Sequence, residues 1–366
     1  MTALARLGQL GQSVWLDSIS REWLASGELA RMVDELSITG LTSNPSIFAG
    51  ALRSSIYDAE ITDCIAEGLD DRAIFERLAV ADIRGACDVL RPAWKRSGGV
   101  DGMVSIELEP DLAHDTDASI RRAHELWQLV NRSNLMIKVP ATTAGMDVVR
   151  SLIRDGINVN VTLLFGVTEY RKVMEQYLAA LEDRHAAGDN LVVHSVASFF
   201  VSRVDTAIDG LLDESHAGNH LRGRIAVANA LSAWDAYMQV FTSDRFLSLQ
   251  RNGARPQRPL WASTGTKDPG LSDIIYVQEL IAAGSVNTMP LATMRSFQDH
   301  GDPRITVTDD ALRDARAMLG DLRGLGVSLD NVTQTLRDQG VAAFEQSFDE
   351  LLASIASRRA SLQPHG

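Results

Sequence analysis

The feature that most constrains the fold is an alternation of short apolar segments with longer amphipathic ones along most of the chain. Eight of the short segments have the length and composition of β-strands. They span residues 14–19, 38–43, 103–108, 135–140, 157–163, 192–199, 260–263 and 285–289. A helical pattern follows each of the first seven, which predicts parallel strands joined by helices. Eight such units favour closure into a barrel over an open sheet.

The segments between the strands carry the periodicity of helices. Helices are predicted near residues 27–36, 54–68, 73–96, 118–131, 145–154, 168–187, from 202 onward, 222–249 and 273–283. Two more, near 308–322 and 341–357, form a C-terminal extension over about 308–357. The prediction is one α/β domain over residues 1–366, a (β/α)8 TIM-type barrel with additional helices and a helical C-terminal tail. Periodicity leaves open whether the last helix covers the barrel or packs on its outside.

Composition argues against several classes of function. The chain has 48 acidic and 35 basic side chains, and the resulting net charge of −13 disfavours nucleic acid as a partner. Its two cysteines, Cys64 and Cys87, favour a reducing compartment, and no apolar run is long enough to span a membrane. We therefore expect a cytoplasmic protein, either a monomer or a homodimer. The scattered histidines and the lack of dinucleotide or P-loop motifs predict neither a metal nor another cofactor.

Polar side chains stand inside or just after most of the predicted strands. They are Asp17, Thr42, Ser43, Asn44, Glu107, Lys138, Asn160, Thr162, Ser198 and Ser263. Any one of them could be a paired core residue or a cap, because a buried polar group is costly unless it is paired. In a β/α barrel, however, the active site lies at the C-terminal ends of the strands. The repetition of this placement favours an active site over a set of unrelated core residues.

Lys138 is the most informative of these residues. Only four of the 35 basic residues are lysines, so the chain otherwise uses arginine for positive charge. Lys138 lies between apolar neighbours in LMIKVP, and burial favours the neutral amine that attacks a carbonyl. The alternative is a buried lysine paired with a carboxylate, a role that arginine would fill equally well. The presence of lysine rather than arginine at this position therefore favours a nucleophilic role for Lys138.

Asp17 and Glu107 supply carboxylates for the proton transfers that cleavage through a lysine imine requires. The structural alternative for Asp17 is a cap of the following turn, and for Glu107 it is an ion pair at the strand end. Glu109 would share a face with Glu107 in a continuous strand, but Pro110 indicates that the strand has ended.

Two cations follow the later strands. Arg203 comes after the sixth strand and Lys267 after the seventh, each close to a predicted helix start. Loops in this part of β/α barrels commonly bind phosphate, and two cations suit a sugar phosphate. Each residue alone could be an ordinary surface charge.

Three motifs resemble the transaldolase family, in its longer bacterial form. Residues 41–46 (LTSNPS), 137–142 (IKVPAT) and 157–165 (INVNVTLLF) resemble its second strand, its Schiff-base lysine strand and its fifth strand. They occur in the family's order, within a resemblance that extends from residue 14 to about 294. Residues 261–267 (WASTGTK) resemble the version in the longer bacterial members.

The resemblance implies a role for each candidate residue. Lys138 would form the Schiff base, Asp17 would take the hydroxyl proton that triggers cleavage, and Glu107 with Thr162 would activate water. The residues implied to bind substrate are Ser43, Asn44, Asn160, Ser198 and Phe200 around the dihydroxyacetone unit, and Arg203, Ser263 and Lys267 around phosphate. The implied reaction is transfer of dihydroxyacetone from sedoheptulose 7-phosphate to glyceraldehyde 3-phosphate in the pentose phosphate pathway. Its products are erythrose 4-phosphate and fructose 6-phosphate, and it uses no cofactor.

Two alternatives remain beside this expectation. A fructose 6-phosphate aldolase of the same superfamily shares the lysine and releases free dihydroxyacetone. Those aldolases tend to carry Gln in place of Glu107 and Tyr in place of Phe200, so both residues here favour transfer. The second alternative is a non-catalytic barrel that only binds sugar phosphates, which the presence of Lys138, Asp17 and Glu107 disfavours. Many members carry an arginine after strand seven in a Ser-Phe-Arg arrangement, whereas this chain has Lys267 slightly later.

Overall fold

The centre of the protein is a closed barrel of eight parallel strands. The computed structural model describes residues 2–216 and 218–363. The strands are β1 (Ser13–Asp17), β2 (Gly40–Thr42), β3 (Met103–Glu107), β4 (Leu135–Pro140), β5 (Val159–Leu164), β6 (Ser195–Phe200), β7 (Arg258–Ala262) and β8 (Val286–Met289). Each strand pairs with its neighbours in the chain, and β8 closes the barrel against β1. The predicted α/β barrel is confirmed.

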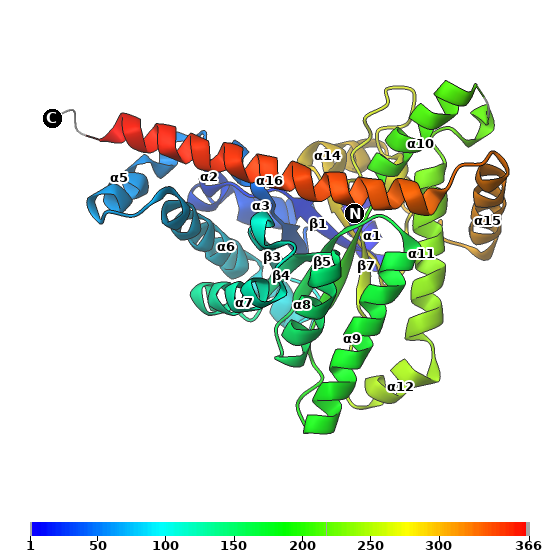
Figure 1. Ribbon diagram of the computed structural model, residues 1–366, viewed down its shortest axis with the longest axis horizontal. Helices are drawn as coiled ribbons and strands as arrows, with labels where there is room; N and C mark the ends of the chain where they lie inside the picture. The colour runs from blue at the N-terminus through cyan, green and yellow to red at the C-terminus, as the bar shows by residue number, and fades with distance from the viewer. Residues whose placement is uncertain (1, 217, 364–366) are drawn as a thin grey trace.

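Helices surround this barrel (Figure 1). They are α1 (Ala3–Gln9), α2 (Arg21–Ala25), α3 (Glu28–Glu35), α4 (Pro45–Ala51), α5 (Asp58–Ala66), α6 (Asp71–Arg96), α7 (Thr116–Val130), α8 (Thr143–Arg154), α9 (Val167–Ala187), α10 (Ser202–Ser215), α11 (Ile225–Phe241), α12 (Asp244–Arg251), α13 (Ile275–Gln278), α14 (Leu291–His300), α15 (Asp309–Gly324) and α16 (Leu329–Leu362). Short 3-10 turns lie at Ser55–Tyr57, Pro110–Leu112 and Asn219–Leu221. Within the described residues, no helix has both the length and the apolar character needed to cross a membrane.

The predicted helix boundaries differ from the structure in identifiable ways. The helix predicted at 222–249 is two helices, because Ser243 caps a new start at α12 by accepting a hydrogen bond from the Phe246 amide at 3.4 Å. The helix predicted at 273–283 is mainly loop around the short α13. The last helix begins at Leu329, well before the predicted residue 341, because Ser328 caps its first turn. The short helices α1, α2, α4 and α14 were not predicted.

The barrel interior is filled by side chains from alternate strand positions. Trp15 of β1 is fully buried and lies opposite Gly40 of β2. A Cβ atom on Gly40 would lie 2.3 Å from the indole ring, so a glycine is required at this position. Asp17, two residues beyond Trp15, points in the same direction one layer higher. The indole therefore forms part of the floor beneath the functional end of the barrel.

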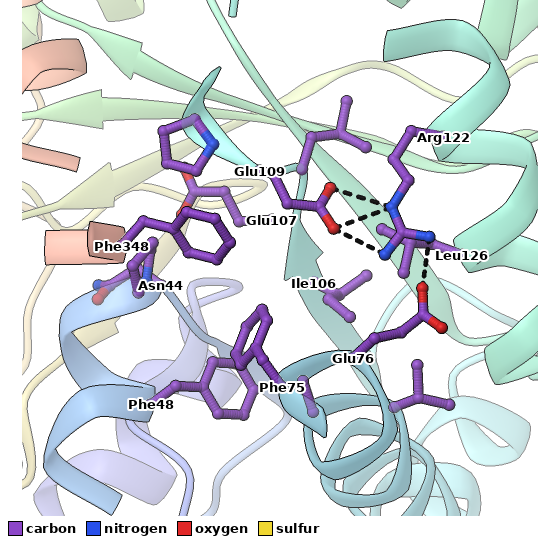
Figure 2. A pocket seen from close by; sticks show the side chains of 15 residues that line it. Asn44, Phe48, Phe75, Glu76, Ile106, Glu107, Glu109, Arg122, Leu126 and Phe348 are labelled. Carbon is purple, nitrogen blue, oxygen red and sulfur yellow. Dashed lines mark hydrogen bonds and ion pairs between the residues drawn. The ribbon is translucent and has the colours of Figure 1, made fainter. Parts of the chain in front are cut away.

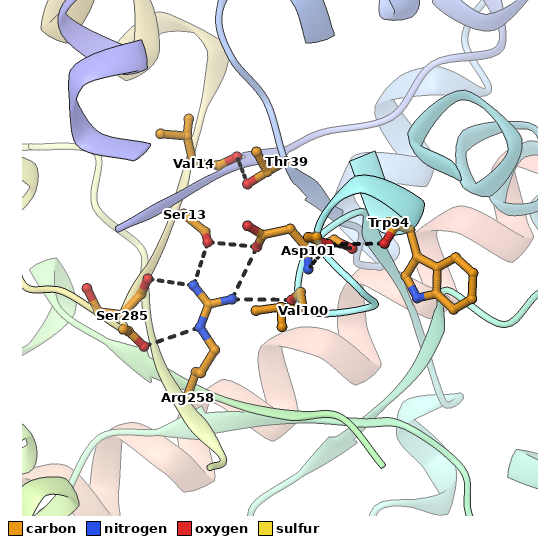
Figure 3. A network of polar contacts seen from close by, with 10 residues as sticks. Ser13, Val14, Thr39, Trp94, Val100, Asp101, Arg258 and Ser285 are labelled. Atoms are coloured by element: carbon orange, nitrogen blue, oxygen red, sulfur yellow. Dashed lines mark hydrogen bonds and ion pairs between the residues drawn. The ribbon is translucent and has the colours of Figure 1, made fainter. Parts of the chain in front are cut away.

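An arginine network joins the strands at the opposite, N-terminal end (Figure 3). Arg258 of β7 donates hydrogen bonds to the Ser13 hydroxyl, to the Ser285 carbonyl at 2.9 Å and to an Asp101 carboxylate oxygen at 3.1 Å. Ser13 in turn donates to the same Asp101 oxygen at 2.7 Å. The network links β1, β7, the start of β8 and the loop before β3, so it ties the first and last strands of the barrel together.

Replacement of Arg258 is expected to lower stability without changing the opposite end of the barrel. In Arg258→Met, Asp101 and the Ser285 carbonyl lose a charged donor. Broken buried pairs cost about 3–5 kcal/mol, and we expect about 2–3 kcal/mol here because water reaches part of this pair. Urea unfolding measures the loss, with exposed Arg251→Met as a control expected to change stability by less than about 0.5 kcal/mol. A loss as small as that of the control would contradict the role of the network.

The C-terminal helix α16 lies across the carboxyl end of the barrel. It packs against α4, α6, α10 and the end of β5, and Figure 1 shows it extending from α15 to α5. Phe348 of this helix meets Phe75 of α6 edge to face, with ring centroids 5.5 Å apart. Of the two positions that periodicity left open, the structure therefore supports the one in which the helix covers the barrel.

Candidate active site

A polar cavity of about 210 Å³ opens at the carboxyl end of the barrel, beneath α16. It is lined by Asp17, Thr42, Asn44, Lys138, Thr162, Ser198, Phe200, Arg203, Ala262, Ser263, Gly265, Lys267, Thr288, Pro290 and Phe344. These residues come from seven strands or the loops that follow them, from α10 and from α16. The cavity thus occupies the position in which β/α barrels place their active sites.

Lys138 lies buried on β4 in the wall of this cavity. Its Nζ atom donates to the Glu107 carboxylate at 3.0 Å and to the Ser43 carbonyl at 3.1 Å. Glu107 is its direct neighbour in the register of β3 and β4. The carboxylate pairing that stood as the alternative to a nucleophilic lysine is therefore present. The same contact also holds the amine in one place and provides a proton acceptor beside it, so the two roles are compatible.

Asp17 lies at the end of β1 and lines the same cavity as Lys138. Its carboxylate accepts a hydrogen bond from Thr42 at 2.6 Å, and the Thr42 hydroxyl lies 2.8 Å from that of Thr288. Burial raises the pKa of Asp17, against the opposing effects of the Lys138 charge and the Thr42 hydrogen bond. Burial likewise raises the pKa of Glu107, which the Asp17 charge raises further. Both carboxyl groups are thereby suited to exchange protons nearer neutral pH than ordinary acids are.

Glu109 takes no part in this group. β3 ends at Glu107, and the Glu109 carboxylate pairs instead with Arg122 of α7 at 2.7 Å. Figure 2 shows this pair, with Arg122 also contacting Glu76, in a pocket beside the cavity. The strand end predicted from Pro110 therefore separates the two glutamates.

The amide and hydroxyl residues of the middle strands form a layer behind the cavity. Ser198 donates to the Asn160 side-chain oxygen at 2.7 Å, and the Asn160 amide donates to the Ser105 hydroxyl at 3.0 Å. Ser43 donates to the Ser105 carbonyl at 2.8 Å. Of the residues predicted to surround substrate, Ser198 therefore lines the cavity, whereas Asn160 and Ser43 support it from behind.

Asn44 and Thr162 both line the cavity with a hydrogen-bonding group available. The Asn44 side-chain oxygen caps α4 by accepting from the Ile47 amide at 3.0 Å, which leaves its NH2 group for other partners. The Thr162 hydroxyl is buried and has no hydrogen-bond partner among the described residues. Thr162 precedes a bulge in β5, at which Leu163 adopts a positive φ of 58°. A buried hydroxyl without a partner is costly, so a ligand or water at this point would stabilise it.

Both predicted cations line the cavity. Arg203, the second residue of α10, forms no ion pair with a carboxylate in the described part of the chain, and burial lowers the pKa of its guanidinium. Its Cζ atom lies 5.4 Å from the ring centroid of Phe200. Ser263 shares a 2.9 Å hydroxyl contact with Ser202, and Lys267 is exposed on the loop after β7. This corner offers positive charge and an open helix N-terminus to an anion.

Sequence reasoning missed five residues of the cavity wall, which are Ala262, Gly265, Thr288, Pro290 and Phe344. Thr288 of β8 occupies the same kind of position as the residues that were identified, a polar side chain near the end of an apolar strand, so the same rule could have found it. Phe344 of α16 carried no such signal, because it reaches the cavity through the docking of a distant helix. Among the described residues, no group of three His, Cys, Asp or Glu side chains is arranged to hold a metal.

Replacing Asp17 by Asn is expected to stabilise the protein increasingly as the pH rises. Burial raises the pKa of Asp17, so the stability linked to this group is fully present below its unfolded pKa and is lost as pH rises through its folded pKa. Asn keeps the acceptor for Thr42 and does not ionise. Urea unfolding at about pH 5 and about pH 8 should show a larger advantage of Asp17→Asn at the higher pH. An advantage that does not change with pH would contradict the burial argument.

Together, a buried lysine, two buried carboxyl groups and a half-buried arginine form an enzyme site suited to a phosphorylated carbonyl compound. The sequence pattern of the Transaldolase/Fructose-6-phosphate aldolase family matches residues 14–355. The chain belongs to this family and is an enzyme of it.

Curated relatives agree with this assignment over nearly their whole length. A protein named Transaldolase from Mycobacterium bovis (strain BCG / Pasteur 1173P2) is 49% identical over 354 residues, covering 95% of each chain. Transaldolase from Thermobifida fusca (strain YX) is 47% identical over 366 residues, covering 98% of each chain. Transaldolase 1 from Streptomyces coelicolor is 49% identical over 358 residues, covering 96% of this chain and 94% of its own.

Proposed function

We propose that this enzyme is a transaldolase that moves a dihydroxyacetone unit from sedoheptulose 7-phosphate to glyceraldehyde 3-phosphate. The products are erythrose 4-phosphate and fructose 6-phosphate, as in the pentose phosphate pathway. The observation that carries the proposal is the buried Lys138, which pairs with Glu107 and lines a cavity together with Asp17 and with Arg203, an arginine that pairs with no carboxylate of the described residues. The names of the curated relatives support it.

Lys138 is the covalent catalyst in this proposal. Its neutral amine adds to the ketose carbonyl, and loss of water gives an imine. Glu107 is well placed to take and return the protons of these steps, since its carboxylate lies 3.0 Å from Nζ. The unpartnered hydroxyl of Thr162 provides a contact for the water that is lost and later added. No further cofactor is needed, because the iminium ion itself accepts the electrons of the broken bond.

Asp17 is the base for carbon–carbon cleavage. It takes the proton of the hydroxyl next to the breaking bond, so that an aldehyde leaves and the three-carbon unit stays on Lys138 as an enamine. The raised pKa of Asp17 suits a group that must both accept this proton and return it to the acceptor.

The remaining residues divide between the two ends of the substrate. Asn44 and Ser198 are assigned to the hydroxyl groups of the dihydroxyacetone unit, while Ser43 and Asn160 hold the wall behind them. Arg203 is assigned to phosphate, with Ser263 and the exposed Lys267 completing that end. Phe200 supports Arg203 and provides an apolar wall.

Transfer is favoured over an aldolase reaction by two residues. Glu107 is an acid rather than an amide, and Phe200 lines the cavity with a ring that cannot activate water.

We further propose that the chain acts as one domain in the cytoplasm, as a monomer or homodimer, with sugar phosphates rather than nucleic acid or membranes as its partners. The net charge of −13 supports the exclusion of nucleic acid.

Trapping of the covalent intermediate tests the proposed function. Borohydride reduction with fructose 6-phosphate should add one reduced three-carbon unit to Lys138, as read by intact and peptide mass. Lys138→Ala and Lys138→Arg should both lose the adduct and lower kcat by at least about 10³-fold. The arginine variant is the sharper control, because it retains a positive charge for Glu107. Turnover by Lys138→Arg, or an adduct on another residue, would refute the mechanism.

Phe200→Tyr is expected to shift the products toward free dihydroxyacetone. A phenol at this position brings a group that can activate water to the cavity wall. The measurement is the ratio of released dihydroxyacetone to transferred unit, with fructose 6-phosphate as donor. Phe165→Tyr is the matched control, since its ring packs 5.1 Å from that of Phe200 without lining the cavity. An unchanged ratio in Phe200→Tyr would show that this position does not decide between transfer and release.

A further inference from the structure

One aromatic ring in the cavity comes from outside the barrel. Phe344 of α16 lines the cavity together with Lys138, and its ring centroid lies 5.6 Å from the lysine Nζ atom. The side chain is 7% exposed, although it sits at the end of the barrel where the strands stop. The ring therefore occupies space above the amine that water would otherwise fill.

The position of Phe344 is fixed by contacts on both sides of it. One turn earlier, Gly340 lies so close to β5 that an added Cβ would be 2.9 Å from the Leu163 side chain. Leu163 is the bulge residue with positive φ, so the bulge and the glycine together set how closely the helix approaches. One turn later, Phe348 packs against Phe75. Because these residues share one face of α16, Phe344 is directed into the cavity between two packed neighbours.

The C-terminal end of α16 is also anchored. Arg358 donates to the Asp58 carboxylate at 2.6 Å, and Arg359 lies 3.1 Å from that of Asp71. Nearer the cavity, the hydroxyls of Ser347 and Ser46 lie 3.0 Å apart, which joins the helix to α4. These contacts fix the position of α16, and with it the position of the ring.

We propose that Phe344 is a further substrate-site residue that shields the covalent intermediate from solvent and so favours transfer of the three-carbon unit over its release. The inference rests on the proposed transaldolase function. It gives α16 a chemical role in addition to its packing role.

The two fates of the intermediate differ in what the enamine carbon bonds to, since water hydrolyses an imine at the end of both. After cleavage, the three-carbon unit is an enamine on Lys138. Attack of its nucleophilic carbon on an aldehyde, whose oxygen takes a proton from Asp17, forms the new carbon–carbon bond, and hydrolysis of the resulting iminium ion frees the new ketose, which is transfer. Protonation of that carbon gives an iminium ion, and addition of water followed by breakage of the C–N bond gives dihydroxyacetone and the free amine, which is release. Solvent above the amine can supply the proton that the enamine carbon takes up in release. The Phe344 ring fills that space and excludes this solvent.

Three variants of α16 separate shielding from packing. Phe344→Ala opens the space above Lys138, Phe344→Leu keeps most of the volume, and Phe348→Ala removes a ring of equal size one turn away. The measured quantity is the ratio of released dihydroxyacetone to transferred unit, and thermal unfolding verifies that each protein is folded. We expect the ratio to rise about tenfold in Phe344→Ala. In Phe344→Leu and Phe348→Ala we expect it to stay within about twofold of the original protein.

Each other outcome overturns a defined part of the argument. An unchanged ratio in folded Phe344→Ala, with transfer intact in the original protein, overturns the shielding role and leaves the proposed function standing. An equal rise in Phe348→Ala assigns the effect to general loosening of α16 and also overturns it. Absence of both transfer and a borohydride adduct in the original protein overturns the proposed function, and this inference with it.

Discussion

The pairing of Lys138 with Glu107 is the interaction on which the rest of the site depends. A charged amine in the wall of an apolar barrel is costly unless a partner compensates for it. The partner is the direct register neighbour on β3, so the position of the pair is set by strand pairing rather than by flexible loops. Asp17, two strands away from Glu107 around the barrel, is the second buried carboxyl group, and its charge raises the pKa of Glu107. The register of β3 and β4 therefore sets the relative position of the two paired residues.

The amino end of the barrel contributes mainly to stability, whereas the carboxyl end carries the candidate active site. At the amino end, Arg258 satisfies its donors with Ser13, Asp101 and backbone carbonyls and leaves little bonding capacity unused. At the carboxyl end, the Thr162 hydroxyl has no hydrogen-bond partner and Arg203 no carboxylate partner within the described part of the chain. Groups left unsatisfied in this way cost folding free energy and are typical of sites that bind ligands. Trp15, packed over Gly40, separates the two regions.

Much of the fold and of the site could be predicted from the sequence, because both depend on local patterns. The apolar strands, and the polar residues near their ends, follow from alternation along single segments, and Lys138 was distinctive through the rarity of lysine. The break between α11 and α12 was missed because one capping serine interrupts a continuous helical pattern. The support role of Asn160 was missed because it depends on Ser105, a residue on a different strand. Phe344 lay beyond prediction, since docking of α16 depends on contacts distributed over β5, α4 and α6.

The placement of α16 has a consequence for the order in which the protein is made. Synthesis completes the last barrel strand at Met289, while the helix that roofs the cavity spans Leu329–Leu362. A nascent chain can thus hold all eight strands while the mouth above Lys138 is still open to the surroundings. The Phe344 ring can cover Lys138 only after the final helix has left the ribosome and docked. The cavity therefore takes its mature form last, after all the strands that supply its polar side chains have been made.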